Sequence, residues 1–94
     1  MDLPEDISRR IDELFPVSDR RAAAELLRNA KIHDGSAASS RFQRCALVAS
    51  QGSLEKLGYY VELLAVDYRD VVVAGEYESR AGKLVRTRNL TTSF

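Results

Sequence analysis

Residues 38–65 read ASSRFQRCALVASQGSLEKLGYYVELLA, and this stretch decides the fold. On each side of Gly52 the apolar residues recur at helical spacing, which places them on one face of a helix. Gly52 supplies a left-handed stop for the first helix, and Ser53 caps the second. Because only Gly52 and Ser53 separate them, the two helices are predicted to lie antiparallel as a helical hairpin.

The apolar faces of this hairpin are predicted to form the core. Cys45 falls on the first face, where an unpaired cysteine acts as a small hydrophobic residue. Gly58 lies inside the second helix and is expected to permit close packing. The two faces consist of Ala38, Phe42, Cys45, Ala46 and Ala49, then Leu54, Leu57, Tyr60, Val61, Leu64 and Ala65.

Two more helices are predicted upstream. Asp2 and Glu5 have the form of a capping box that opens a helix running to Phe15. Pro16 ends that helix, and Ser18-Asp19 supplies a new N-cap and first-turn acid. The second helix is expected to end before Gly35.

The segment after Asp67 carries conflicting signals. Asp67 and Asp70 are placed to cap and begin a fifth helix over Tyr68 to Ser79. The β-branched run 71–73 and the turn residues 79–82 instead favour a β-hairpin with residues 83–88. Helix is favoured because an isolated two-stranded hairpin is marginal unless it packs on the helices.

Charge is balanced overall but unevenly distributed. The 94 residues hold 14 basic and 14 acidic side chains, so net charge gives no support for nucleic-acid or membrane binding. Residues 53–78 are acidic, whereas residues 79–94 hold four bases and no acid. Either this basic tail folds back along its acidic neighbour, or it is an arm that grips phosphate or an acidic partner.

Few residues suggest catalysis or a bound group. His33 is the only histidine, which excludes a multi-histidine zinc site, and it is expected to cap a helix or face solvent. Neither a glycine-rich phosphate loop nor a calcium-loop pattern occurs, so no cofactor or metal is predicted. The length of 94 residues predicts one domain, residues 1–94. The single Cys45 and the lack of a long apolar run indicate a cytoplasmic protein.

Packing roles are predicted for several polar and aromatic residues. Ion pairs among Arg44, Arg69 and Asp70 are expected to dock the last helix. Tyrosines are expected to pack their rings at the boundary of the core. These tyrosines are Tyr59, Tyr60, Tyr68 and Tyr77. The C-terminal tail is expected to pack on the helices through its apolar residues, which are Leu84, Val85, Leu90 and Phe94.

The order of motifs over residues 41–94 resembles a group of short uncharacterised bacterial proteins. The resemblance implies an all-helical fold whose helix pairs stack as a right-handed superhelix, in the manner of armadillo or HEAT repeats. It implies no catalytic activity and no ligand. It rests on Arg41-x-x-Arg44-Cys-Ala-Leu, Gly52-Ser-Leu54-Glu-Lys-Leu57, Asp67-Tyr-Arg-Asp-Val71, Glu76-Tyr77 and Arg86-Thr-Arg88-Asn-Leu90 before Phe94.

The sequence therefore favours an all-α, non-enzymatic module that binds another protein, with a second copy of the chain as one partner to consider. An alternative is nucleic-acid or phosphate binding through the basic tail, helped by Arg20 and Arg21. The candidate partner-binding residues are Arg80, Lys83, Arg86 and Arg88 in the tail, with Glu76 and Glu78 in the acidic segment.

Overall fold

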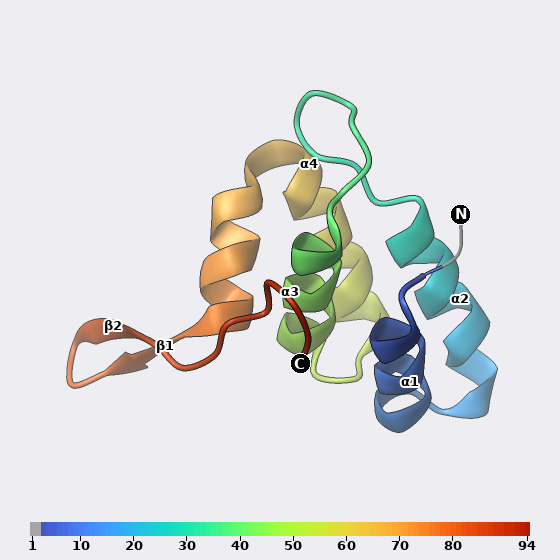
Figure 1. Ribbon diagram of the computed structural model, residues 1–94, viewed down its shortest axis with the longest axis horizontal. Coiled ribbons are helices and arrows are strands. Elements are labelled where there is room, and N and C mark those ends of the chain that lie inside the picture. The colour runs from blue at the N-terminus through green and yellow to red at the C-terminus, as the bar shows by residue number, and fades with distance from the viewer. Residues whose placement is uncertain (1–2) are drawn as a thin grey trace.

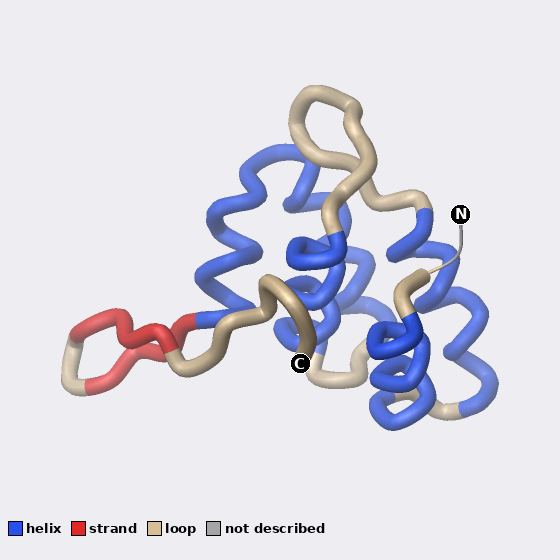
Figure 2. The backbone as a smooth tube through the Cα atoms, in the orientation of Figure 1, coloured by secondary structure: helices blue, strands red, loops and turns tan. Residues whose placement is uncertain are grey.

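The computed structural model describes residues 3–94 and shows a mostly helical chain that ends in a small β-hairpin. The helices pack together, and the two strands project away from them (Figures 1 and 2). The predicted all-α class is therefore wrong at the C-terminal end. The elements are α1 (Glu5–Leu14), α2 (Val17–Arg28), α3 (Ser40–Ser50), α4 (Leu54–Glu76), β1 (Tyr77–Arg80) and β2 (Lys83–Arg86).

The predicted hairpin of two helices is confirmed as α3 and α4, which make the most extensive contact among the described elements. Ser53 caps α4, its Oγ accepting the Lys56 N–H at 3.3 Å. Gln51 and Gly52 both have positive φ, of 53° and 79°, and turn the chain between the helices. A Cβ on Gly52 would lie 2.7 Å from the carbonyl oxygen of Leu14, so only glycine fits there.

Helix α4 is interrupted at Asp67, where the backbone is non-helical at φ −153° and ψ 96°. The Asp67 carboxylate accepts the Arg69 N–H at 3.1 Å, as an N-capping aspartate does. The helix predicted to begin here therefore exists as the part of α4 that follows the break, so residues 3–94 form four helices, of which the last is divided in two at Asp67. It ends at Glu76, not at Ser79.

The run 71–73 is helical, and its first residue, Val71, is fully buried. The β-hairpin begins only after α4 has ended, with Tyr77 opposite Arg86 and Arg80 opposite Lys83. Ala81 and Gly82 form its turn with φ of 50° and 77°, the positive pair that a two-residue hairpin turn requires. The turn anticipated over residues 79–82 is correct, but the strands are shorter than that alternative supposed.

The first two helices differ from the prediction at their N-terminal ends. Pro4 is the N-cap of α1 and Glu5 is its first residue, so Glu5 does not hold the third helical position that the predicted capping box requires; Asp2, the predicted cap, lies outside the described residues. Pro16 is the N-cap of α2, so Ser18 and Asp19 lie in its first turn and the predicted N-cap was wrong. Arg20 closes the preceding helix instead, donating from Nη2 to the Asp12 carbonyl at 2.9 Å.

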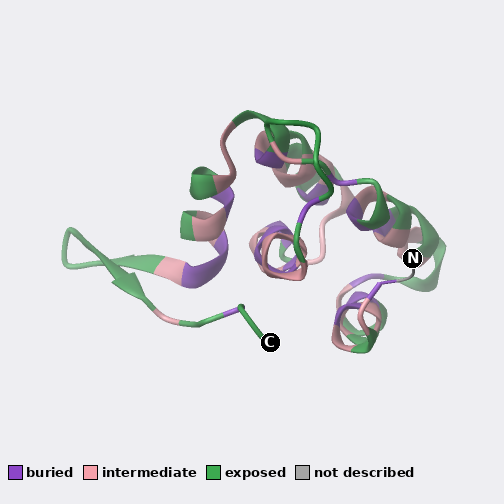
Figure 3. Cartoon of the chain, turned by 45° about the horizontal axis from the view of Figure 1, so that its top comes forward, coloured by how far each residue is buried: buried purple, intermediate pink, exposed green. Residues whose placement is uncertain are grey.

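The core lies between the helices and includes Cys45, as predicted (Figure 3). The close approach of α3 and α4 occurs at Gly75, where a Cβ would lie 2.6 Å from the Cα of Cys45. At Gly58 a Cβ would meet nothing within 4 Å, so the close packing expected there was wrong. Ala65 is exposed, and the other predicted face residues are buried or partly buried.

Candidate functional site

Glu76, the last residue of α4, is the centre of an ionic cluster. Its side chain is 0% exposed, and its carboxylate accepts bonds from Arg41 Nε at 2.8 Å and Arg41 Nη2 at 3.0 Å. Arg86 in β2 adds a bond from Nη2 at 2.6 Å. The thiol of Cys45 completes the cluster at 3.5 Å. One buried carboxylate therefore holds α3, α4 and the hairpin together.

The cluster sets the ionisation of its members. Hydrogen bonds from Arg41 dominate and lower the pKa of Glu76 to about 2, although burial acts in the opposite direction. Burial and the neighbouring Glu76 charge raise the pKa of the Cys45 thiol to about 12. Glu76 is therefore charged and Cys45 protonated near neutral pH, a combination that disfavours a nucleophilic role for this cysteine.

The backbone at the end of α4 fastens the chain that returns from the hairpin. The Glu76 carbonyl accepts the Thr87 N–H at 2.8 Å and the Arg88 N–H at 3.3 Å. Arg88 Nη1 also donates to the Gly75 carbonyl at 3.0 Å. These bonds satisfy carbonyls that the end of a helix leaves open. Of the two interpretations of the charge pattern, folding back on the acidic neighbour holds at Arg86 and Arg88.

A second anchor holds the last residues of the chain. Arg44 in α3 is only 5% exposed and pairs with Asp6 of α1, Nε to Oδ2, at 2.8 Å. Its Nη1 donates to the carbonyls of Leu90 and Thr91, each at 3.2 Å. Bonding from Arg44 lowers the pKa of Asp6. Leu90 is 1% exposed, which confirms it as an anchor of the tail.

The ion pairs predicted to dock the last helix are different in the structure. Arg44 pairs with Asp6, as above, and Arg69 forms a local pair with Asp67, from Nε to Oδ1, at 3.1 Å. Asp70 is exposed. The helical spacing in the sequence correctly placed Arg44 and Arg69 on helices. It could not show which helices pack against each other, and therefore which acid each arginine would meet.

The hairpin is exposed from Glu78 to Arg86, and only its first residue, Tyr77, is partly buried (Figure 3). Leu84 is 62% exposed and Val85 is 39% exposed, so the prediction that they anchor the tail was wrong. On the opposite strand Arg80 pairs with Glu78 at 3.3 Å, and both side chains are exposed. The hairpin thus presents apolar side chains to solvent although the segments on both sides of it are fastened to the helices.

Positive charge is in excess around the hairpin. The hairpin and the residues at its base hold five basic side chains and two carboxylates, which leaves a surplus of three positive charges. The bases are Arg41, Arg80, Lys83, Arg86 and Arg88, and the acids are Glu76 and Glu78. All six predicted partner-binding residues therefore lie in or beside the hairpin, while Arg41 was missed. Arg41 and Glu76 are 35 residues apart in sequence, too far for a helical spacing to relate them.

The pattern of strand pairing determines which peptide groups the hairpin exposes. Thr87 donates to the Glu76 carbonyl, and bonded pairs alternate along an antiparallel ladder. With the observed register, the peptide groups of Val85 and Lys83 face β1, whereas those of Leu84 and Arg86 face outward. The sheet in residues 3–94 has two strands, so the outer edge of β2 has no strand beside it there.

A shallow groove of about 460 Å³ lies beside the hairpin, between α3 and the end of α4. Tyr77 lines this groove and also a second, more polar hollow that Glu78 and Arg88 line. Tyr68 stacks on Phe42 with 4.9 Å between ring centroids, as its predicted packing role requires. Tyr59 is exposed, contrary to prediction.

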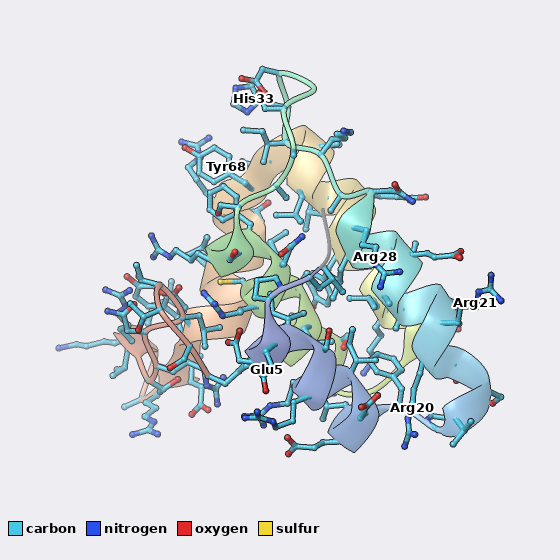
Figure 4. All side chains as sticks on the ribbon, turned by 45° about the vertical axis from the view of Figure 1, so that its right-hand side comes forward. Glu5, Arg20, Arg21, Arg28, His33 and Tyr68 are labelled. Carbon is cyan, nitrogen blue, oxygen red and sulfur yellow. The ribbon has the colours of Figure 1, made fainter. Side chains whose placement is uncertain are left out.

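His33 and the two arginines of α2 lie elsewhere. His33 is exposed on the loop before α3 and stacks on Tyr68 at 6.0 Å (Figure 4). Arg20 and Arg21 lie on α2, away from the hairpin, and Arg21 pairs with Glu25 at 3.6 Å (Figure 4). The structure therefore does not bring Arg20 and Arg21 together with the basic residues of the tail.

Within residues 3–94, no three His, Cys, Asp or Glu side chains are grouped as metal ligands would be. No helix of the described chain is both long and apolar enough to cross a membrane. Comparison with protein-family models, curated proteins and solved structures finds no match. The resemblance to short bacterial proteins, and the armadillo-like stacking that it implies, therefore stay predictions.

Proposed function

We propose that this protein is a non-enzymatic helical module that binds another protein through its C-terminal β-hairpin. The observation that carries the proposal is the projection of the hairpin away from the helices, with Leu84 exposed and the edge of β2 unpaired in the described chain. The unpaired N–H and C=O groups of a sheet edge are a template for pairing with another chain.

The contacts at the base of the hairpin hold it in a fixed position before a partner binds. Glu76 binds Arg86 from one side and Arg41 from the other, while its carbonyl accepts the Thr87 N–H. These contacts hold both ends of the hairpin against the helices. A segment ordered before binding loses less conformational entropy when a partner docks, which favours affinity.

The chemistry of the cluster supports a binding role over a catalytic one. Its carboxylate is enclosed by two arginines and its thiol is held protonated, so neither group is poised as a base or a nucleophile near neutral pH. The free, buried thiol also fits the reducing cytoplasm proposed as its location.

The test is affinity capture with paired variants. Leu84→Thr removes an exposed apolar side chain from the hairpin, and Val17→Thr removes one from the start of α2. We expect wild type and Val17→Thr to capture the same partner proteins, and Leu84→Thr to lose them. Equal capture by Leu84→Thr, or no capture by wild type at cellular concentration, would count against the proposal.

Nucleic-acid binding is the second candidate, and the surplus of positive charge favours it. Arg86 and Arg88 are already bonded to Glu76 and to the Gly75 carbonyl, which leaves fewer bases to neutralise several phosphates together. A gel-shift titration of single-stranded and double-stranded DNA and RNA at low salt tests it. Binding that weakens steeply with added salt would support it, and no shift at low salt would exclude it.

A further inference from the structure

We propose that β2 accepts an extended acidic segment of the partner protein as a third strand, opposite Lys83–Arg86. This inference rests on the proposed protein-binding function and specifies its chemistry. It is carried by the outward peptide groups of Leu84 and Arg86, together with the surplus of positive charge around the hairpin.

The free edge of β2 is complementary to a peptide backbone. Leu84 and Arg86 each direct an N–H and a C=O away from β1, and the spacing of these groups matches the hydrogen bonds of an antiparallel or parallel strand. Strand addition of this kind takes affinity from main-chain bonds and selectivity from side chains. A nucleic acid has no equivalent row of alternating donors and acceptors.

The edge of β1 is a poorer site for the same segment. The N–H of Tyr77 already donates to the Val73 carbonyl at the end of α4, so β1 has one fewer donor to offer. Glu78 is an exposed carboxylate on β1 and would repel an acidic segment, whereas β2 has no acid. The third strand is therefore assigned to β2.

The side chains of β2 define what the added strand should contain. Residues directly opposite one another on neighbouring strands interact across the pair. Lys83 favours an acidic residue opposite it, and Leu84 and Val85 favour apolar ones. Arg86 shares the single charge of Glu76 with Arg41, so that group keeps a net positive charge and also favours an acidic residue opposite. The preferred segment therefore reads acidic, apolar, apolar, acidic, in either direction along the strand.

The same charges argue against a second copy of the chain at this edge. Two β2 strands joined through their outward peptide groups would bring Lys83 and Arg86 of both copies to one four-residue edge, where their like charges repel. An acidic segment instead neutralises charge that the contacts of Glu76 and Glu78 leave unbalanced.

The experiment measures amide hydrogen exchange by NMR in the full-length protein. The probe is the capped peptide Ser-Thr-Glu-Val-Val-Glu-Thr-Ser. We expect saturating peptide to slow exchange at Leu84 and Arg86 at least about fivefold and to leave Ser79 unchanged, as strand addition protects the newly bonded amides. A peptide with lysine in place of both glutamates, or with N-methylated valines, should bind at least about tenfold more weakly.

Two charge-reversed proteins provide the matched comparison. Lys83→Glu should weaken binding of the glutamate peptide at least about fivefold, whereas Lys31→Glu, at an exposed position before α3, should leave it unchanged. No slowing at Leu84 with millimolar peptide, or equal binding of the lysine peptide, would overturn the inference.

Protection of Leu84 by self-association without peptide, or by a single-stranded oligonucleotide, would also overturn the inference. If it fails while wild type still captures partners that Leu84→Thr loses, the protein-binding function stands and only the acidic strand is wrong. If that capture fails as well, both proposals fall.

Discussion

Gly58 and Gly75 lie in the same helix but meet different surroundings. A Cβ on Gly75 would contact backbone atoms of Cys45, which cannot rotate away, whereas a Cβ on Gly58 would enter open space. We expect Gly75→Ala to lower the free energy of unfolding by about 3 kcal/mol through overpacking. Gly58→Ala should raise it by about 0.5–1 kcal/mol, as alanine favours helix. Urea unfolding followed by circular dichroism measures both, and equal effects would contradict this account of the α3–α4 contact.

Glu76 should make the stability of the protein depend on pH. Its folded pKa of about 2 lies below the ordinary value of 4.5, so its charged form stabilises the folded state above pH 4.5. That contribution, about 3 kcal/mol, is lost progressively as pH falls from 4.5 towards 2. Glu76→Gln should therefore be less stable than wild type at pH 7, and the difference should shrink across this range.

Denaturant unfolding of both proteins at several pH values gives that difference. Glu55→Gln, at an exposed position in the first turn of α4, is the control. A gap between wild type and Glu76→Gln that stays constant from pH 7 to pH 2 would show that the Glu76 charge is not what holds the cluster.

At the scale of elements, the hairpin depends on its turn. Ala81 has φ of 50°, a left-handed conformation that asparagine adopts more readily than alanine. Ala81→Asn gives the Asn-Gly pair favoured in such turns and should stabilise the hairpin by about 1 kcal/mol. Hydrogen exchange at the Val85 amide, which faces β1, should slow by about fivefold. Gly82→Ala, at φ 77°, should speed it, and the opposite order would refute the turn assignment.

At the scale of the whole molecule, Leu90 joins the end of the chain to the helices. It is buried beside the Arg44 contact that links α3, α1 and the tail. Leu90→Ala should lower the free energy of unfolding by about 2–4 kcal/mol, because it opens a cavity in the core. Leu84→Ala, at an exposed site, should change it by less than about 0.5 kcal/mol. Thermal unfolding of both variants is the measurement, and similar losses would show that the tail is not part of the core.

Local features were predictable because their causes are local. The cap at Ser53, the break at Asp67 and the apolar face containing Cys45 all follow from residues within a turn or two of one another. The end of α4 was predicted three residues too late. At the end of this helix, the Glu76 carbonyl accepts a hydrogen bond from Thr87, which lies 11 residues further along the chain. A contact over that distance leaves no local signal in the sequence.

The candidate surface was predictable in composition but not in arrangement. The excess of bases after residue 78 is visible in the sequence, and all four bases lie in or next to the hairpin. The sequence does not show which of these four bases remain available to a partner. Arg86 and Arg88 bind the end of α4, while Lys83 faces solvent on the hairpin, and that division depends on distances in three dimensions.

By itself the sequence determined the helical periodicity, the tight connection between α3 and α4, and the separation of acidic from basic segments, since each depends on neighbours along the chain. Tertiary structure alone decided that Glu76 is buried between Arg41 and Arg86, and that Leu84 stays exposed while Leu90 is covered. The physical reason is that burial and ion pairing depend on which elements pack together, and two leucines in one tail carry no local mark of their different surroundings.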